Sequence, residues 1–182
     1  MRNAITAEAF LAHQRHTMLA IAKMLEEANI EDVKIIEPSD EVPFFVLMSH
    51  YYADENPEPY SLTAIFFPET HLSDDGLLLQ LFLQLPSGLM PQDEALIARV
   101  LPYLNNALPF GHFSLIPQDD GFWYINFRYV HMVSAKNGLD VSTLRDYFNL
   151  MLRLPSIYDM PLRRLIKKEI TVTELFKMLE NG

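Results

Sequence analysis

A run in the middle of the chain, Leu77 to Leu85, constrains the fold more than any other stretch. Every second residue of the run is a leucine, and the residues between them mix Gln80 and Gln84 with Leu78 and Phe82. Because successive side chains of a β-strand point to opposite faces, the alternation predicts a strand with one apolar and one mixed face. A mixed face is typical of an antiparallel sheet that is packed on one side and meets solvent or a partner on the other.

A β-hairpin is predicted in the stretch from Pro102 to Val133, which holds the only Trp of the chain. Two strand-like runs flank Asp119-Asp120-Gly121, and this tripeptide favours a tight turn because Asp and Gly tolerate positive φ. Asp74-Asp75-Gly76 precedes the leucine run in the same way. For both Asp pairs the hairpin turn is a better interpretation than a pair of catalytic carboxylates.

The complete pattern predicts an α+β fold with helices packed on one face of a largely antiparallel, five-stranded sheet. The expected order is α-β-β-β(-β)-α-β-β-α followed by C-terminal helices, with the strand count ambiguous between residues 33 and 67. The first helix spans about residues 6–28 and ends at Asn29. Pro102 predicts a kink or break in the middle helix, and Pro155 and Pro161 predict interruptions near the end. We expect one domain over residues 1–155 and a helical extension over residues 156–182.

Charge and composition narrow the possible partners. The net charge is −10 and there is no Cys, so the sequence argues against nucleic acid and anionic membrane as partners and excludes disulfides and thiolate chemistry. Residues 136–182 hold eight basic and six acidic residues, whereas residues 1–135 hold six and eighteen. This asymmetry suggests contact between the two parts or between two copies of the chain. No signal peptide or membrane span is predicted, so a cytoplasmic protein is expected.

Motifs for catalysis are weak. His13 and His16 have a spacing that suits a metal pair on a helix, but no acidic ligand lies one turn away. The sequence contains no nucleophile elbow and no Gly-rich phosphate loop. We therefore predict no catalytic residue, no cofactor and no metal; an enzyme with an unrecognised His or carboxylate site is the less favoured alternative.

The mixed sheet face gives the sharpest functional hypothesis. Its candidate partner-binding residues combine aromatic, amide and guanidinium groups, the composition of a protein interface: Phe82, Phe122, Tyr124, Asn126 and Arg128. Two interpretations are open, because the face either binds a partner or is covered by the C-terminal tail. The acidic loop with Asp54, Glu55 and Glu58 is either a docking site for a basic partner or a solvated loop.

The segment LNNALPFGHFSLIPQDDGFWYINFRYV is similar to the corresponding part of YbjN-type domains. The order of elements over roughly residues 6–155 resembles the type III secretion chaperone-like fold. The resemblance implies a small, acidic, often dimeric protein that binds polypeptide and has no catalytic residues. The basic tail with Pro155 and Pro161 departs from that pattern. We therefore expect a non-enzymatic module, a homodimer, that binds a protein or peptide; a structural subunit of a bacterial assembly is the alternative.

Overall fold

The computed structural model describes residues 7–52, 58–66, 76–86, 88–134 and 137–180. Within them the chain forms helices, strands and one short 3-10 turn, η2 (Pro91–Asp93). The helices are α1 (Ala7–Glu27), α2 (Glu94–Ala107), α3 (Val141–Ile166) and α4 (Val172–Glu180). The strands are β1 (Glu31–Ile36), β2 (Val46–Tyr51), β3 (Tyr60–Phe66), β4 (Gly76–Gln84), β5 (His112–Pro117) and β6 (Trp123–Ser134).

The strands make one antiparallel sheet in the order β1-β2-β3-β4-β6-β5. The predicted α+β class and antiparallel sheet are confirmed. The expected count of five strands is wrong by one, because β1 is a true strand at the sheet edge. A register shift between Glu31 and Lys34, with Asp32 at φ 53°, marks a bulge in this edge strand. The number of strands between residues 33 and 67, which the sequence left ambiguous, is thus the larger of the two expected.

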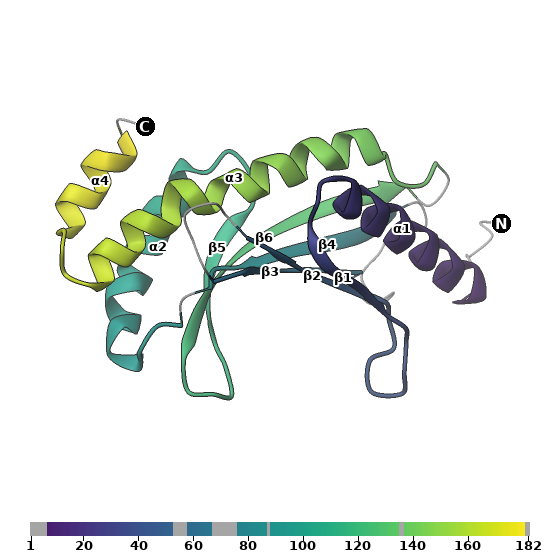
Figure 1. The fold of residues 1–182 in the computed structure, drawn as a ribbon, viewed down its shortest axis with the longest axis horizontal. Helices are drawn as coiled ribbons and strands as arrows, with labels where there is room; N and C mark the ends of the chain where they lie inside the picture. The colour runs from purple at the N-terminus through teal and green to yellow at the C-terminus, as the bar shows by residue number, and fades with distance from the viewer. Residues whose placement is uncertain (1–6, 53–57, 67–75, 87, 135–136, 181–182) are drawn as a thin grey trace.

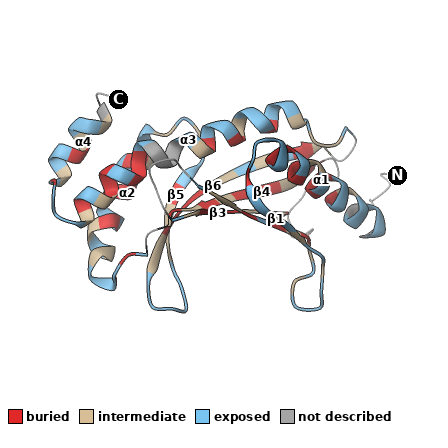
Figure 2. Cartoon of the chain, in the orientation of Figure 1, coloured by how far each residue is buried: buried red, intermediate tan, exposed pale blue. Residues whose placement is uncertain are grey.

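The core lies between the sheet and the helices. Leu79, Leu81 and Leu83 of β4 are completely buried on the face that α1 and α3 cover (Figure 1). Figure 2 colours the buried residues red, and they gather on the strands and on the parts of the helices that lie against the sheet. The leucine alternation in β4 is therefore the pattern that fixes which face of the sheet is packed.

Local signals set the helix ends. α1 ends where Asn29 takes φ 57°, and Ile30 N–H then donates to Leu25 O at 3.0 Å, which satisfies a carbonyl of the last turn. α3 begins after Asp140, whose side chain accepts hydrogen bonds from the backbone N–H groups of Ser142 and Thr143. The predicted end of the first helix at Asn29 is confirmed.

The proline positions correct the prediction of broken helices. α2 runs through Pro102, and α3 runs through residues 155 and 161 as one helix. A proline removes one backbone hydrogen bond, whereas burial of an apolar helix face stabilises every turn. Leu101 and Leu104 bury that face in α2, and Leu162 and Leu165 bury it in α3. The boundary expected after residue 155 consequently lies inside α3.

The C-terminal tail packs on the helices. The rings of Tyr103 in α2 and Phe176 in α4 lie 4.5 Å apart, and Leu175 is fully buried. Figure 1 shows α4 beside α2 and α3, on the helix side of the molecule. The described tail therefore docks within the same chain and does not cover the mixed face of the sheet.

Candidate interaction surface

The face of the sheet opposite α1 and α3 is uncovered by any described helix. Paired residues of neighbouring strands share a face, so the strand register defines this surface, which we call the open face. It consists of Glu31, Lys34, Ile36, Val46, Met48, His50, Ser61, Thr63, Ile65, Leu78, Gln80, Phe82, Gln84, His112, Ser114, Ile116, Tyr124, Asn126, Arg128, Val130 and Met132.

Several apolar side chains of the open face are exposed. The exposed fraction is 69% for Met132, 45% for Ile36, 41% for Met48 and 37% for Val130. They come from both halves of the sheet, and half-buried Phe82 of β4 lies between these halves. Exposed apolar groups over one continuous face are typical of a surface that binds another molecule.

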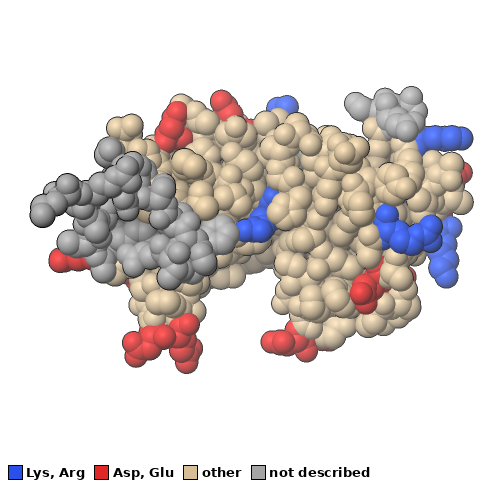
Figure 3. All heavy atoms as spheres, turned by 180° about the vertical axis from the view of Figure 1, so that it is seen from behind, with Lys and Arg blue, Asp and Glu red and all other residues tan. Residues whose placement is uncertain are grey.

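Two acidic projections flank the open face. The β1–β2 connection and the β5–β6 hairpin both extend away from α1 and α3 (Figure 1), and Figure 3 shows carboxylates at their ends with a hollow between them. The tip of the first is a turn closed by Ser39 N–H donating to Val42 O at 2.8 Å, and it carries Asp40 and Glu41. The second carries Asp119 and Asp120. A partner that fills the hollow would therefore meet negative charge at two sides.

Phe82 and Arg128 are brought together, as the mixed-face hypothesis expects. They are directly paired across β4 and β6, and the guanidinium carbon of Arg128 lies 5.9 Å from the Phe82 ring centre. Arg128 Nε also donates to Gln80 Oε1 at 2.9 Å. Asn126 is the next open-face residue of β6, but it is only 5% exposed. The centre of the open face is thus a pair of hydrogen-bonded polar side chains beside an aromatic ring.

Tyr124 and Phe122 lie farther along, toward the hairpin tip. The Tyr124 hydroxyl donates to Asp120 Oδ2 at 3.2 Å, and burial together with this hydrogen bond raises the pKa of Tyr124. Phe122 lies outside β6, where its backbone N–H donates to Asp120 Oδ1 at 2.9 Å. The five predicted residues therefore form a line from sheet centre to hairpin tip and not one compact patch.

The most exposed apolar residues of the open face are absent from the predicted set. Val130 and Met132 continue the alternation of Tyr124, Asn126 and Arg128, so the β6 pattern was sufficient to find them. Ile36 and Met48 lie on β1 and β2, and only the register of these strands shows that they share the surface.

On the helix side of the sheet lies a buried group of polar contacts that the sequence did not indicate. Asp159 in α3 is 4% exposed, and its Oδ2 accepts from the Tyr60 hydroxyl at 2.8 Å and from Arg163 Nε at 2.9 Å. Tyr60 opens β3, so the contact joins α3 to the sheet across 99 positions of sequence. With a Tyr donor and an Arg partner on one oxygen, the carboxylate is held as a structural acceptor.

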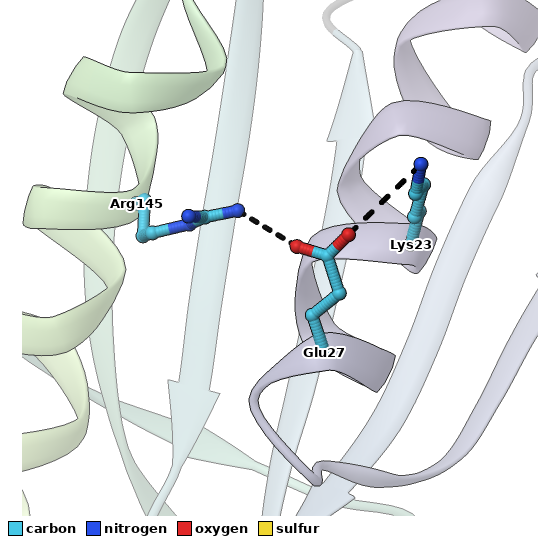
Figure 4. A network of polar contacts seen from close by, with 3 residues as sticks. All are labelled: Lys23, Glu27 and Arg145. Atoms are coloured by element: carbon cyan, nitrogen blue, oxygen red, sulfur yellow. Dashed lines mark hydrogen bonds and ion pairs between the residues drawn. The ribbon is translucent and has the colours of Figure 1, made fainter.

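The seam between α1 and α3 contains a small hollow of about 290 Å³. Its wall includes the apolar side chains of Met24, Phe148 and Leu152. Glu27 on α1 spans the seam to Arg145 on α3 at 2.9 Å and also meets Lys23 at 4.0 Å (Figure 4). All three charged groups are at least half exposed, so these ion pairs contribute little stability.

The histidines form no recognisable reactive site in the described residues. His13 is partly buried. Its pKa is lowered mainly by this burial and, to a smaller extent, by the charge of the nearby His16. No group of three His, Asp or Glu side chains that could hold a metal occurs in that part of the chain. Burial also lowers the pKa of His131, against the opposing effect of Asp140. His71, Asp74 and Asp75, and the loop residues Asp54 and Glu55, lie outside the described residues.

The chain matches no protein-family model, no curated protein and no solved structure. Among the described helices, none has the length and apolar character needed to cross a bilayer.

Proposed function

We propose that this chain is a non-enzymatic protein-binding module that takes a polypeptide partner on the open face of its sheet. The observation that carries the proposal is the exposure of Met132, Ile36, Met48 and Val130 on a face that no described helix covers. Apolar side chains held on a sheet gain free energy of about 25 cal/mol per Å² when a partner removes them from water.

The charges suggest the chemistry of the partner. Glu31, which pairs with His50 at the sheet edge, is the one carboxylate among the described open-face residues, whereas Asp40, Glu41, Asp119 and Asp120 are exposed at the flanking projections. A polypeptide with apolar residues at its centre and basic residues at its ends would match both the apolar side chains of the open face and the acidic projections beside it. Such complementarity contributes to the rate and the specificity of association more than to affinity.

The proposal agrees with the function implied by the resemblance to secretion chaperone-like and YbjN-type domains. A homodimer and a cytoplasmic location belong to the same proposal. Because the tail packs on α2 and α3, the surface that a partner would use is not occupied by described tail residues. This packing supports the interface interpretation of the mixed face over intramolecular cover.

Affinity capture with matched variants tests the proposal. Met132→Lys and Met48→Lys place a charge on the open face, and Leu150→Lys places one on α3 at a site that is 46% exposed. Proteins captured by the wild type and by Leu150→Lys, but lost from both Met variants, would support the open face as the interface. If capture is equal for all three variants while each remains folded, the proposal fails.

A further inference from the structure

Strand β6 extends beyond β5, so part of β6 has no described strand on that side. β5 pairs with β6 only from Trp123 to Arg128, whereas β6 continues to Ser134. The next described backbone contact on that side is the hydrogen bond from Gly138 N–H to Ser134 O at 2.9 Å. We call the interval between these contacts, residues 129–133, the β6 gap.

Val130 and Met132 direct their backbone groups into the β6 gap. In an antiparallel pair, successive residues point their N–H and C=O groups to alternate sides. Leu85 N–H donates to Ile125 O at 2.9 Å, so the odd-numbered residues of β6 face β4. Ser134 O accepts from Gly138, so the even-numbered residues face the other side. An edge with backbone donors and acceptors in this arrangement is a template for another strand.

The chain before β5 leaves the sheet plane, which keeps the β6 gap open. Gly111 has φ 66° and lies so close to β6 that an added Cβ would be 2.7 Å from Arg128 O. The ring of Phe110 then packs 5.4 Å from Tyr129 and 5.7 Å from Tyr147, on the helix side of β6. The segment preceding β5 therefore covers the helix face and does not extend the ladder.

The two sides of the β6 gap differ in chemistry. Exposed Met132 and Val130 line it on the open face. On the helix side Tyr129 stacks on Tyr147 at 4.8 Å, and the Tyr129 hydroxyl lies 3.3 Å from His131 Nδ1. An added strand would place alternate side chains against methionine and valine on one face and against aromatic rings on the other.

We propose that the β6 gap binds an extended segment of the partner polypeptide as an additional strand of the sheet. This inference rests on the proposed function and specifies the form in which the partner is bound. Between Arg128 and Ser134 the gap spans roughly 20 Å, at ~3.3 Å for each residue, so it accepts a segment of about five residues. The net charge of −10 favours a segment with basic and not acidic flanking residues.

A second copy of the chain fits the β6 gap poorly. The gap is bounded by the start of β5 at one end and by Gly138 at the other, so the matching gap of a second copy is equally recessed. A strand pair of this length also buries far less than the roughly 1,200 Å² of a stable protein interface. A flexible extended segment can enter the recess, and a weak peptide complex needs less buried area than a stable dimer.

Random peptides displayed on phage and selected on the immobilised full chain provide the probes for the test. Val130→Pro and Met132→Pro each remove one N–H from the β6 gap and leave the ladder to β4 unchanged, whereas Val130→Ala keeps the N–H. We expect the selected peptides to bind each Pro variant at least ~10-fold more weakly and Val130→Ala less than ~3-fold more weakly.

Peptides with N-methyl groups on alternate residues test the same contact on the wild-type chain, should a Pro variant unfold. The N-methyl groups can be placed on the odd-numbered or on the even-numbered peptide residues. One placement should abolish binding and the other should leave binding unchanged. Equal effects of the two placements would overturn strand addition. If the peptides bind the Pro variants normally but lose binding to Met48→Lys, strand addition fails and the proposed function stands. If selection yields no peptide, both proposals fail.

Discussion

The side-chain amide of Asn105 forms two hydrogen bonds with the backbone of one residue, Phe113. Phe113 N–H donates to Asn105 Oδ1 at 2.6 Å, and Asn105 Nδ2 donates to Phe113 O at 3.0 Å. Asn105 lies in the last turn of α2 and Phe113 lies in the edge strand β5. The amide thus occupies backbone groups that a further strand would use, and it protects this sheet edge as β-proteins commonly require.

Loss of this amide should destabilise the fold. Asn105→Ala leaves the Phe113 N–H and C=O partly buried without the amide, so we expect a loss of about 1–3 kcal/mol in the free energy of unfolding. Asn106→Ala is the control, because Asn106 is exposed at the next position. Urea denaturation of both variants checks the expectation, and equal midpoints for the two would contradict it.

Gly111 should be intolerant of a side chain for two separate reasons. Its φ is 66°, and an added Cβ would lie 2.4 Å from the Phe127 ring and 2.7 Å from Arg128 O. Gly121 has φ 84°, but no atom of the described residues lies within 4 Å of its Cβ position. Gly121→Ala should therefore cost about 1 kcal/mol of backbone strain, and Gly111→Ala clearly more, about 2–4 kcal/mol. Thermal unfolding compares the two, and a smaller loss for Gly111→Ala would disprove the close approach.

The buried carboxylate of Asp159 should be sensitive to removal. Asp159→Ala leaves the Arg163 guanidinium, which is 23% exposed, without its carboxylate, and we expect a loss of about 3–5 kcal/mol. Tyr60→Phe removes only the hydroxyl donor and should cost about 1 kcal/mol. Chemical denaturation measures both changes. A loss for Asp159→Ala no larger than that for Tyr60→Phe would show that the ion pair contributes little.

Asp140 should make stability depend on acid pH. Hydrogen bonds from Thr143 and Ser142 at the start of α3 lower its pKa to about 2. A carboxyl whose folded-state pKa is depressed stabilises the fold above its unfolded pKa of about 3.9, and this contribution disappears as the pH falls toward 2. The stability difference between wild type and Asp140→Asn, which can still cap the helix, should therefore shrink between about pH 5 and pH 2. A difference that stays constant over this range would contradict the pKa shift.

Whether a feature of the fold can be predicted from the sequence depends on how far apart in the chain the interacting residues lie. The leucine alternation in β4 predicts the packed and open faces because it is a local pattern, and Asn29 predicts the end of α1 for the same reason. Local rules fail at Pro102, since burial of α2 outweighs one lost hydrogen bond. They also give no sign of the Tyr60–Asp159 contact, because it depends on how α3 crosses the sheet.

The candidate surface shows the same division. Phe82 and Arg128 could be assigned to one face from their own strands, and the structure pairs them directly. Ile36 and Met48 could be assigned to the open face only from the strand order and register of the sheet. The β6 gap depends on where β5 ends relative to β6, which no pattern within either strand specifies.

Site-specific photo-crosslinking tests the central claim, that the open face receives a polypeptide, most directly. A benzoylphenylalanine at Thr63, between Met48 and Phe82 on the open face, is compared with one at Leu150 on α3. We expect a crosslinked product with a discrete partner from position 63 and none from position 150 in a lysate of the source cells. Equal labelling at both positions, or labelling from position 150 alone, would contradict it.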